Sequence, residues 1–206
     1  MMLVVDCCVR GDASSTRQYY EAYLRKNGYT EENVAVLKLA EQDLAPLTNV
    51  DLEKRDALRY AGKYDDAMFD LARQFRDADE ILVAAPFWDL SFPSILKVYL
   101  EHVSVCDITF GYASDGSSVG YCKAKRLLYF SSCGGFVGAE HQGFAYVQAF
   151  AEMMGIRDCE AYTLEGMDID PSKRKDLLEH AIAVLYIPWR LSDLCKANHL
   201  VFFCCR

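Results

Sequence analysis

Residues 80–103 constrain the fold of this chain more than any other stretch. They open with five consecutive apolar residues, 81–85, which Pro86 ends, and this pattern is typical of a strand buried on both faces of a sheet. The loop 87–90 carries two aromatic residues, and apolar residues at helical spacing follow as far as Val103. The stretch therefore predicts a strand, an aromatic loop and a helix. The loop would lie at the carboxyl end of the strand, where open α/β sheets bind ligands.

The helix after the aromatic loop has two candidate start signals. Ser91 is a candidate N-cap, because its hydroxyl can accept a hydrogen bond from a free backbone N–H. Pro93 fits the first turn, where no N–H is needed. We expect His102, near the end of this helix, to be packed against the rest of the protein.

Strands and helices alternate along the rest of the chain. Strands are expected at 2–5, 34–39, 81–85, 126–132 and 157–164, and helices at 16–26, within 51–78 with a break at Gly62, after Ser91, at 144–154 and from 170 to about 185. Such alternation predicts an α/β fold of three layers, with a parallel sheet between helices on both faces. Five strands fit the flavodoxin-like order 2-1-3-4-5. Residues 106–125 contain three glycines and are expected to form a loop or hairpin.

Length, composition and charge limit the class of protein. The 206 residues, 52% of them hydrophobic, are expected to form one domain, 1–206, with an extra tail from about residue 186 that could pack on the body or on a second subunit. The net charge of −8 argues against nucleic acid as a partner. No apolar run approaches about 18 residues and the N-terminus shows no signal peptide, so we expect no membrane contact and a cytoplasmic location.

The chain has nine cysteines and no Cys-x-x-Cys pair. An odd number without a metal-binding spacing is typical of reduced thiols in a cytosolic protein, so we expect no metal site. Cys7 and Cys8 have no evident resolving partner and are expected to be inert, packed side chains.

The loop after the first strand has the features of an anion site. Ser14, Ser15 and Thr16 stand together at the start of a helix, with Arg10 just before them. The free N–H groups and the dipole of a helix N-terminus favour an anion there, and the hydroxyls add donors. Ordinary helix capping is the alternative. Because neither a Walker A nor a Gly-x-Gly-x-x-Gly pattern is present, a nucleoside triphosphate or a Rossmann-bound dinucleotide is disfavoured.

A glycine loop follows the fourth expected strand. Gly134 and Gly135 lie within residues 131–138, where the lack of side chains lets backbone N–H groups approach a ligand; a plain glycine turn is the alternative. Loops after strands one, three and four would meet at one edge of the sheet. They offer an anion site, an aromatic wall of Phe87 and Trp88, and backbone donors. Together these suit FMN, which has a flat ring system and a terminal phosphate.

Four segments, in order along the chain, resemble the FMN-dependent NADH azoreductases and the related NAD(P)H quinone dehydrogenases. Residues 84–103, AAPFWDLSFPSILKVYLEHV, are similar to that family's Ala-Pro-Met-Tyr-Asn-Phe flavin loop and the helix after it. Residues 108–116 are similar to its Thr-Phe-x-Tyr-x-x-x-Gly connection, residues 132–135 to its Ser-Arg-Gly-Gly loop, and residues 11–16 to its serine-rich phosphate loop. The resemblance covers about residues 2–185.

The resemblance implies a homodimeric oxidoreductase that binds FMN and passes hydride from NADH or NADPH to a quinone or an azo compound by ping-pong kinetics. The flavin carries the chemistry, so no catalytic side chain is expected. Substrate contacts are expected from Phe110, Tyr112 and His141, although His141 could instead be a solvated loop residue. Cofactor contacts are expected from Arg10, Ser14, Ser15, Thr16, Pro86, Phe87, Trp88, Asp89, Leu90, Ser132, Cys133, Gly134 and Gly135.

Some residues depart from the family pattern. Trp88 and Asp89 stand where the family has Tyr and Asn, and an ionised Asp89 cannot donate a hydrogen bond to a flavin as Asn can. Cys7 and Cys133 replace a Ser and an Arg. These departures keep a flavin-free binding protein of the same fold as an alternative, beside a one-electron carrier like flavodoxin. A phosphorylatable receiver domain would need an aspartate at the end of the third strand, where this chain has Ala-Pro.

Overall fold

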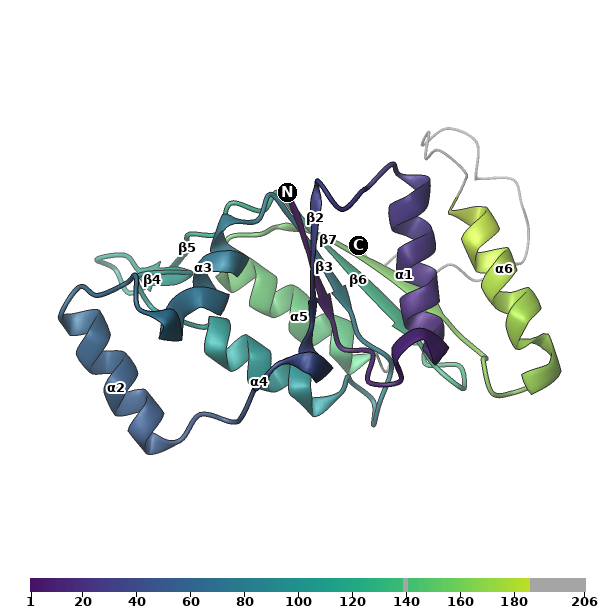
Figure 1. Cartoon of the computed structure of the whole chain (residues 1–206), viewed down its shortest axis with the longest axis horizontal. Coiled ribbons are helices and arrows are strands. Elements are labelled where there is room, and N and C mark those ends of the chain that lie inside the picture. The colour runs from purple at the N-terminus through teal and green to yellow at the C-terminus, as the bar shows by residue number, and fades with distance from the viewer. Residues whose placement is uncertain (139–140, 186–206) are drawn as a thin grey trace.

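The computed structural model describes residues 1–138 and 141–185. Within them five parallel strands form the central sheet: β1 (Met2–Asp6), β2 (Val34–Lys38), β3 (Glu80–Ala84), β6 (Arg126–Ser132) and β7 (Asp158–Leu164). Their order is β2-β1-β3-β6-β7, so the predicted flavodoxin-like order 2-1-3-4-5 is confirmed (Figure 1). The tail predicted from about residue 186 lies outside the described residues.

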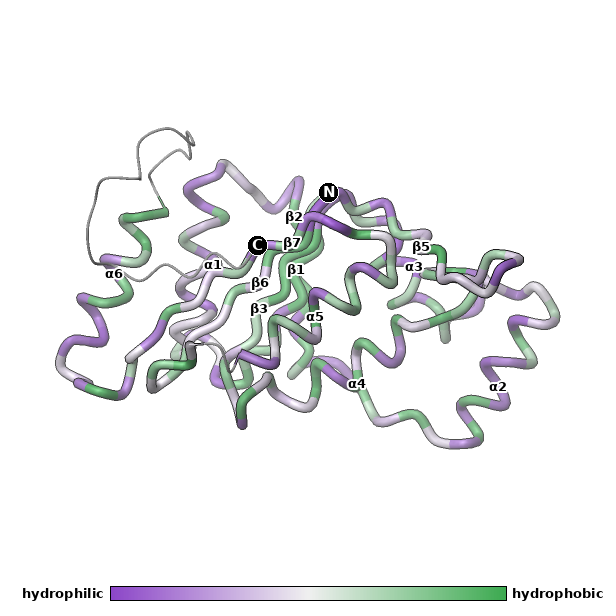
Figure 2. Tube along the Cα trace, turned by 180° about the vertical axis from the view of Figure 1, so that it is seen from behind, coloured by the Kyte–Doolittle hydropathy of each residue, from purple (hydrophilic) through white to green (hydrophobic). Residues whose placement is uncertain are grey.

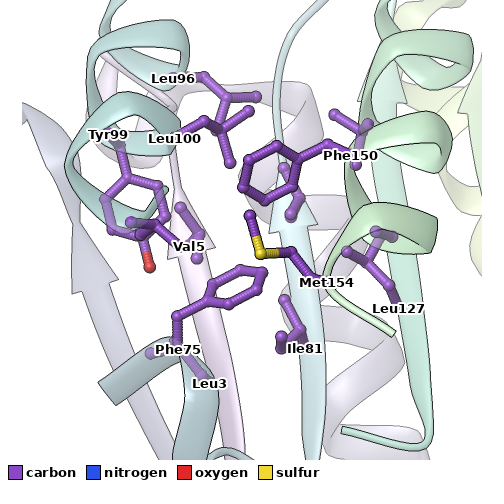
Figure 3. Close-up of a cluster of buried hydrophobic side chains, with 14 of the residues drawn as sticks. Leu3, Val5, Phe75, Ile81, Leu96, Tyr99, Leu100, Leu127, Phe150 and Met154 are labelled. Carbon is purple, nitrogen blue, oxygen red and sulfur yellow. The ribbon is translucent and has the colours of Figure 1, made fainter. Parts of the chain in front are cut away.

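Helices cover both faces of the sheet, which is why its central strands are apolar on both sides (Figure 2). One face is covered by α3 (Asp70–Asp77), α4 (Ser94–Val103) and α5 (Gln142–Met153), and the other by α1 (Ser15–Lys26) and α6 (Arg174–Val184). In β1, Leu3 and Val5 pack toward Phe75 and Phe150 of the first group (Figure 3), whereas Val4 packs toward α1. A fully buried side chain of this size contributes about 1.5–3 kcal/mol, so alternate burial fixes the register of each strand.

The helix α2 (Asn49–Tyr60) lies at the edge of the molecule (Figure 1) and, although described in full, has no buried residue. A capping box between Thr48 and Asp51 fixes its start, because each side chain satisfies a backbone N–H of the other. The break predicted at Gly62 is confirmed, since this glycine has a φ of +68° just after the helix. Four short 3-10 turns complete the described helices: Gly11–Ala13, Leu39–Glu41, Ala67–Phe69 and Pro171–Lys173.

The hairpin predicted within residues 106–125 is confirmed. It consists of β4 (Phe110–Tyr112) and β5 (Ser118–Gly120), which pair antiparallel. Its base packs backbone to backbone on the chain just after α5, where a Cβ added to Gly120 would lie 2.0 Å from the nitrogen of Gly155. The hairpin is therefore anchored at the opposite end of α5 from His141, which is the N-cap of that helix.

The start of α4 differs from the prediction, and the assignments of Ser91 and Pro93 were wrong. Ser91 donates its N–H to the carbonyl of Trp88 at 2.8 Å and accepts from the N–H of Trp88 at 3.2 Å, which closes a tight turn. Pro93 is the N-cap itself, and the helix begins at Ser94. Ser91 is therefore part of a backbone turn and does not cap the helix.

Two predicted packing roles agree with the structure. Cys7 and Cys8 are buried, and burial raises the pKa of both thiols above the ordinary value, so they stay protonated and unreactive at neutral pH. His102 is half-buried, and its Nε2 lies 2.9 Å from the carbonyl oxygen of Ala45. This contact ties α4 to the segment before α2.

Candidate functional site

The carboxyl edge of the sheet carries a cavity of about 270 Å³, where the loops after β1, β3, β6 and β7 meet. Parallel strands bring these loops to one edge, which is where open α/β sheets bind their ligands. The cavity is lined by Val9, Arg10, Ala13, Ser14, Ser15, Pro86, Phe87, Trp88, Ser132, Cys133, Gly134, Met167, Asp168 and Arg174.

The loop after β1 presents the N-terminus of α1 to this cavity. Gly11, with a φ of +58°, opens the 3-10 turn that leads into the helix. Ser14 is the N-cap, and its hydroxyl accepts a hydrogen bond from the N–H of Arg17 at 3.4 Å. Thr16 is buried, and its Oγ1 lies 2.7 Å from the Oγ of Ser132, so it links this loop to the end of β6 instead of lining the cavity.

A buried ion pair between Asp6 and Arg17 stabilises this loop. The Oδ2 of Asp6 accepts hydrogen bonds from the Nε of Arg17 at 2.8 Å and the hydroxyl of Tyr20 at 2.9 Å. Its Oδ1 accepts from the N–H of Cys8 at 2.6 Å, and Arg17 also reaches Asp12 at 3.3 Å. Burial is the largest single influence on Arg17 and opposes its charge, but Asp6, Tyr20 and Asp12 together outweigh it, so the pKa of Arg17 is raised. The guanidinium therefore remains charged and holds both ends of the loop.

The aromatic loop is held by its backbone. The N–H of Phe87 donates to the carbonyl of Ser132 at 3.0 Å, and the N–H of Gln142 at the start of α5 donates to the carbonyl of Leu90 at 3.1 Å. Asp89 and Leu90 have φ values of +47° and +67°, the left-handed region that Gly or Asn usually occupies in such turns. These contacts present Pro86, Phe87 and Trp88 to the cavity and turn Leu90 toward solvent.

The glycine loop after β6 pairs with the segment after β7. The carbonyls of Cys133 and Gly134 accept from the N–H groups of Met167 at 3.1 Å and Asp168 at 2.9 Å. A Cβ added to Gly134 would lie 2.4 Å from the Oδ2 of Asp168, so a side chain there would displace the carboxylate. Cys133 is buried, which raises the pKa of its thiol to about 12. The thiol is neutral at pH 7 and ionises only to an anion, so Cys133 brings no positive charge where the resembled family pattern has an arginine.

The buried polar atoms without a hydrogen-bond partner in the described part of the chain include the Tyr129 hydroxyl, the Ser131 Oγ and the His141 Nε2. The Nδ1 of His141 accepts from the N–H of Phe144 at 3.3 Å, so Nε2 carries the proton of the neutral ring. Burial lowers the pKa of His141, which favours this neutral form. The imidazole packs edge to face against Phe87 and Tyr129, with ring centroids 5.5 and 5.4 Å apart.

The structure brings most of the predicted cofactor residues to one cavity. Nine of them line it: Arg10, Ser14, Ser15, Pro86, Phe87, Trp88, Ser132, Cys133 and Gly134. Four do not line it: Thr16, Asp89, Leu90 and Gly135. The predicted substrate residues Phe110, Tyr112 and His141 also lie outside its lining.

Sequence reasoning missed five residues that line the cavity: Val9, Ala13, Met167, Asp168 and Arg174. Three of these follow β7, whose loop has no glycine pair, hydroxyl cluster or aromatic pair to mark it. The loop after β7 could have been predicted as part of the site, because the loops at the carboxyl ends of parallel strands lie at one edge of the sheet.

Within residues 1–138 and 141–185, no group of three or more His, Cys, Asp or Glu side chains is placed to hold a metal ion. None of the helices in these ranges combines the length and the apolar character needed to cross a bilayer.

Comparison with known proteins places the chain in a family. Residues 1–186 match the model of the flavodoxin-like fold family. The chain is 31% identical over 166 residues to FMN-dependent NADH:quinone oxidoreductase 2 of Clostridium perfringens, covering 80% of this chain and 82% of that protein. It is 30% identical over 162 residues to the protein of the same name from Clostridium acetobutylicum, covering 76% and 80%.

Solved structures show the same fold. An azoreductase from Bacillus anthracis superposes with a TM-score of 0.75 at 22% identity, over 89% of this chain and 95% of that chain. An FMN-dependent NADH-azoreductase from the same species, in complex with FMN, gives a TM-score of 0.73 at 19% identity, over 89% and 96%. By sequence and by architecture, the chain belongs to the flavodoxin-like fold family and is a relative of its FMN-dependent NADH:quinone oxidoreductases.

Proposed function

We propose that this protein is an FMN-dependent oxidoreductase that uses NADH or NADPH to reduce quinones or azo compounds. One observation carries the proposal: four loops meet around a single cavity in a chain that shares 31% identity, over 80% of its length, with an FMN-dependent NADH:quinone oxidoreductase. The azoreductases among its structural neighbours, one of them in complex with FMN, support the same reading.

The residues of the cavity fit FMN at both ends. Ser14, Ser15 and the free N–H groups of α1 are donors for a terminal phosphate, and Arg10 adds a positive charge. Phe87 and Trp88 offer flat apolar surfaces to an aromatic ring. When bound, FMN supplies the hydride chemistry. The role of these side chains is to bind and orient it and to exclude water, so no side chain is proposed as an acid or base.

We further propose a homodimer in which a second copy completes the site. The cavity of about 270 Å³ lies just below the range of typical ligand pockets, roughly 300–1,000 Å³, which supports a site that a second copy completes. Large apolar side chains around it are exposed, which favours an interface: Val9, Trp88, Leu90, Phe136, Tyr146 and Ile169. In such a dimer, Phe110 and Tyr112 would contribute to the partner's site.

The oligomeric state tests this part of the proposal. Sedimentation of the purified protein at micromolar concentration is expected to show a dimer. A monomer at all concentrations would contradict it, because symmetric association through this rim would then be absent.

The kinetic mechanism tests the function. One flat partner at a time fits against the Phe87–Trp88 wall, so the nicotinamide must leave before a quinone or dye enters. Initial rates measured with varied NADH at several fixed quinone concentrations are therefore expected to give parallel double-reciprocal lines. Intersecting lines would contradict a shared site. Negligible quinone reduction, together with a stable one-electron state during stepwise anaerobic reduction, would favour an electron carrier like flavodoxin instead.

The identity of the cofactor is tested separately. Heating the purified protein should release a flavin with the mass of FMN. FAD would contradict the proposal, and no flavin even after reconstitution with FMN would favour a flavin-free binding protein.

We also propose a cytoplasmic location. The six cysteines in the described part of the chain, which include Cys7, Cys8 and Cys133, are all free thiols. A reducing compartment maintains this state. Fractionation of cells that produce the protein would test it.

A further inference from the structure

Arg174 lies in the wall of the candidate FMN cavity but belongs to none of the motifs that the sequence analysis identified. It is the first residue of α6, and it lines the same cavity as Ser14 and Ser15 at the start of α1. Its Nε donates to the carbonyl of Met167 at 3.2 Å, and its Nη2 pairs with the carboxylate of Asp168. A guanidinium has five N–H groups, so donors remain for a ligand.

The packing of the helices brings Arg174 to the phosphate end of the cavity. α1 and α6 cover the same face of the sheet (Figure 1), and both begin at its carboxyl edge. The N-terminus of α1, with Ser14 and Ser15, is where an anion is most favoured. Among the described residues that line the cavity, only Arg10 and Arg174 carry a positive charge. Arg174 is therefore suited to a phosphate that sits on α1.

Asp168 orients this arginine. Its backbone N–H is bound to the carbonyl of Gly134 at 2.9 Å, and its Oδ2 lies over Gly134, which has no side chain to interfere. The main chain of Asp168 is thus held beside the cavity, and its carboxylate pairs with one side of the guanidinium. Its negative charge also faces the cavity, where it opposes the binding of an anion.

We propose that Arg174 binds the phosphate of FMN together with the N-terminus of α1, and that Asp168 orients Arg174 while weakening the attraction for that phosphate. Guanidinium groups bind phosphate through paired hydrogen bonds, which a lysine cannot reproduce. This inference rests on the proposed FMN dependence and adds a phosphate contact from the loop after β7.

Comparing FMN with riboflavin, which lacks the phosphate, tests the inference. The full-length protein is freed of flavin and titrated with each compound, and the dissociation constants are measured by quenching of flavin fluorescence. Arg174→Gln is expected to weaken FMN binding roughly ten- to hundredfold while riboflavin binding stays unchanged. Arg174→Lys should retain part of the preference for FMN. The matched control Lys175→Gln removes an equal charge from a side chain that is 84% exposed and paired with Glu179, and should change neither constant.

A second variant, at Asp168, is expected to change the affinity for FMN in the opposite direction. Asp168→Asn keeps an oxygen that can accept from Arg174 but removes the negative charge, so FMN should bind more tightly with riboflavin unchanged. An unaltered preference for FMN in Arg174→Gln would overturn the inference, as would an equal loss of both flavins, which would indicate a structural role. If Arg174→Gln does not fold, an unaltered preference in both Asp168→Asn and Arg174→Lys overturns it. A wild-type protein that binds neither flavin would instead remove the proposed function itself.

Discussion

Loss of the buried Asp6–Arg17 pair should destabilise this protein strongly. Asp6 has a fully buried side chain, and its Oδ2 accepts from both Nε and Nη2 of Arg17 at 2.8 Å. The substitution Arg17→Met keeps an apolar stem of similar length but leaves the carboxylate with Tyr20 and the N–H of Cys8 as its remaining donors. A buried carboxylate without a cation is strongly disfavoured, so the folded state loses much of its stability.

The size of this effect can be bounded. Breaking a buried ion pair by removing one partner costs about 3–5 kcal/mol, from a total stability of about 5–15 kcal/mol. For a chain of this length each kcal/mol lowers Tm by about 2–4 °C, so Arg17→Met should melt about 6–20 °C below the wild type. Arg25→Met on the same helix is the control. Arg25 is 70% exposed and pairs with Glu21 at 3.8 Å, so its loss should cost about 1 kcal/mol or less.

Thermal melts and urea titrations of the flavin-free protein would measure both variants. The double variant Asp6→Asn/Arg17→Met provides the sharper test, because it removes the stranded charge. It is expected to be more stable than Arg17→Met alone. If Arg17→Met melts within about 2 °C of the wild type, or if the two substitutions simply add, the pair does not stabilise the fold as argued.

Three further predictions follow from single positions. Gly62→Ala should lower Tm by about 2–8 °C, because Gly62 has a φ of +68° that costs an alanine about 1–2 kcal/mol although its Cβ would meet nothing within 4 Å; an unchanged Tm would contradict this. Gly120→Ala should cost about 1–3 kcal/mol in urea titrations, since the added Cβ would meet the backbone of Gly155 at 2.0 Å, whereas the Cβ of the control Gly135→Ala meets nothing within 4 Å. Burial raises the pKa of Cys133 from 9.0 to about 12, so its contribution to the free energy of unfolding is complete below about pH 9 and is lost as the pH rises toward 12. Cys133→Ala should therefore flatten the fall in stability over that range, and an unchanged slope would count against it.

The layout of the sheet was predictable because apolar runs and helical spacing are local signals that the packed structure reinforces. Residues 126–132 were predicted as a strand with the same bounds as β6, since a buried run between polar ends allows little else. The anion loop and the aromatic loop were also predictable, because each carries a local signature of the ligand that it suits.

The remainder of the site depends on contacts between distant segments. Thr16 looks like a phosphate donor in the sequence, but its place one position into α1 turns the hydroxyl toward Ser132. Ser91 has the chemistry of an N-cap, yet its backbone is used in a turn with Trp88. Arg174 enters the cavity only because β7 pairs with β6 and α6 packs beside α1. No local pattern in the sequence carries that information.

The turn at Asp89 and Leu90 bears on how substrate preference could change during evolution. Its shape is set by main-chain hydrogen bonds, one of them from Gln142 at the start of α5, and not by the side chains that it displays. Because the main chain holds the turn, a side chain within it can be replaced without changing the course of the backbone. Trp88 and Asp89 can therefore stand where the family pattern that this sequence resembles has Tyr and Asn, while the loop keeps its course. Phe87 and Trp88, which line the cavity beside this turn, can thus change without altering the fold, and such changes are a route by which proteins of one architecture can acquire different aromatic substrates.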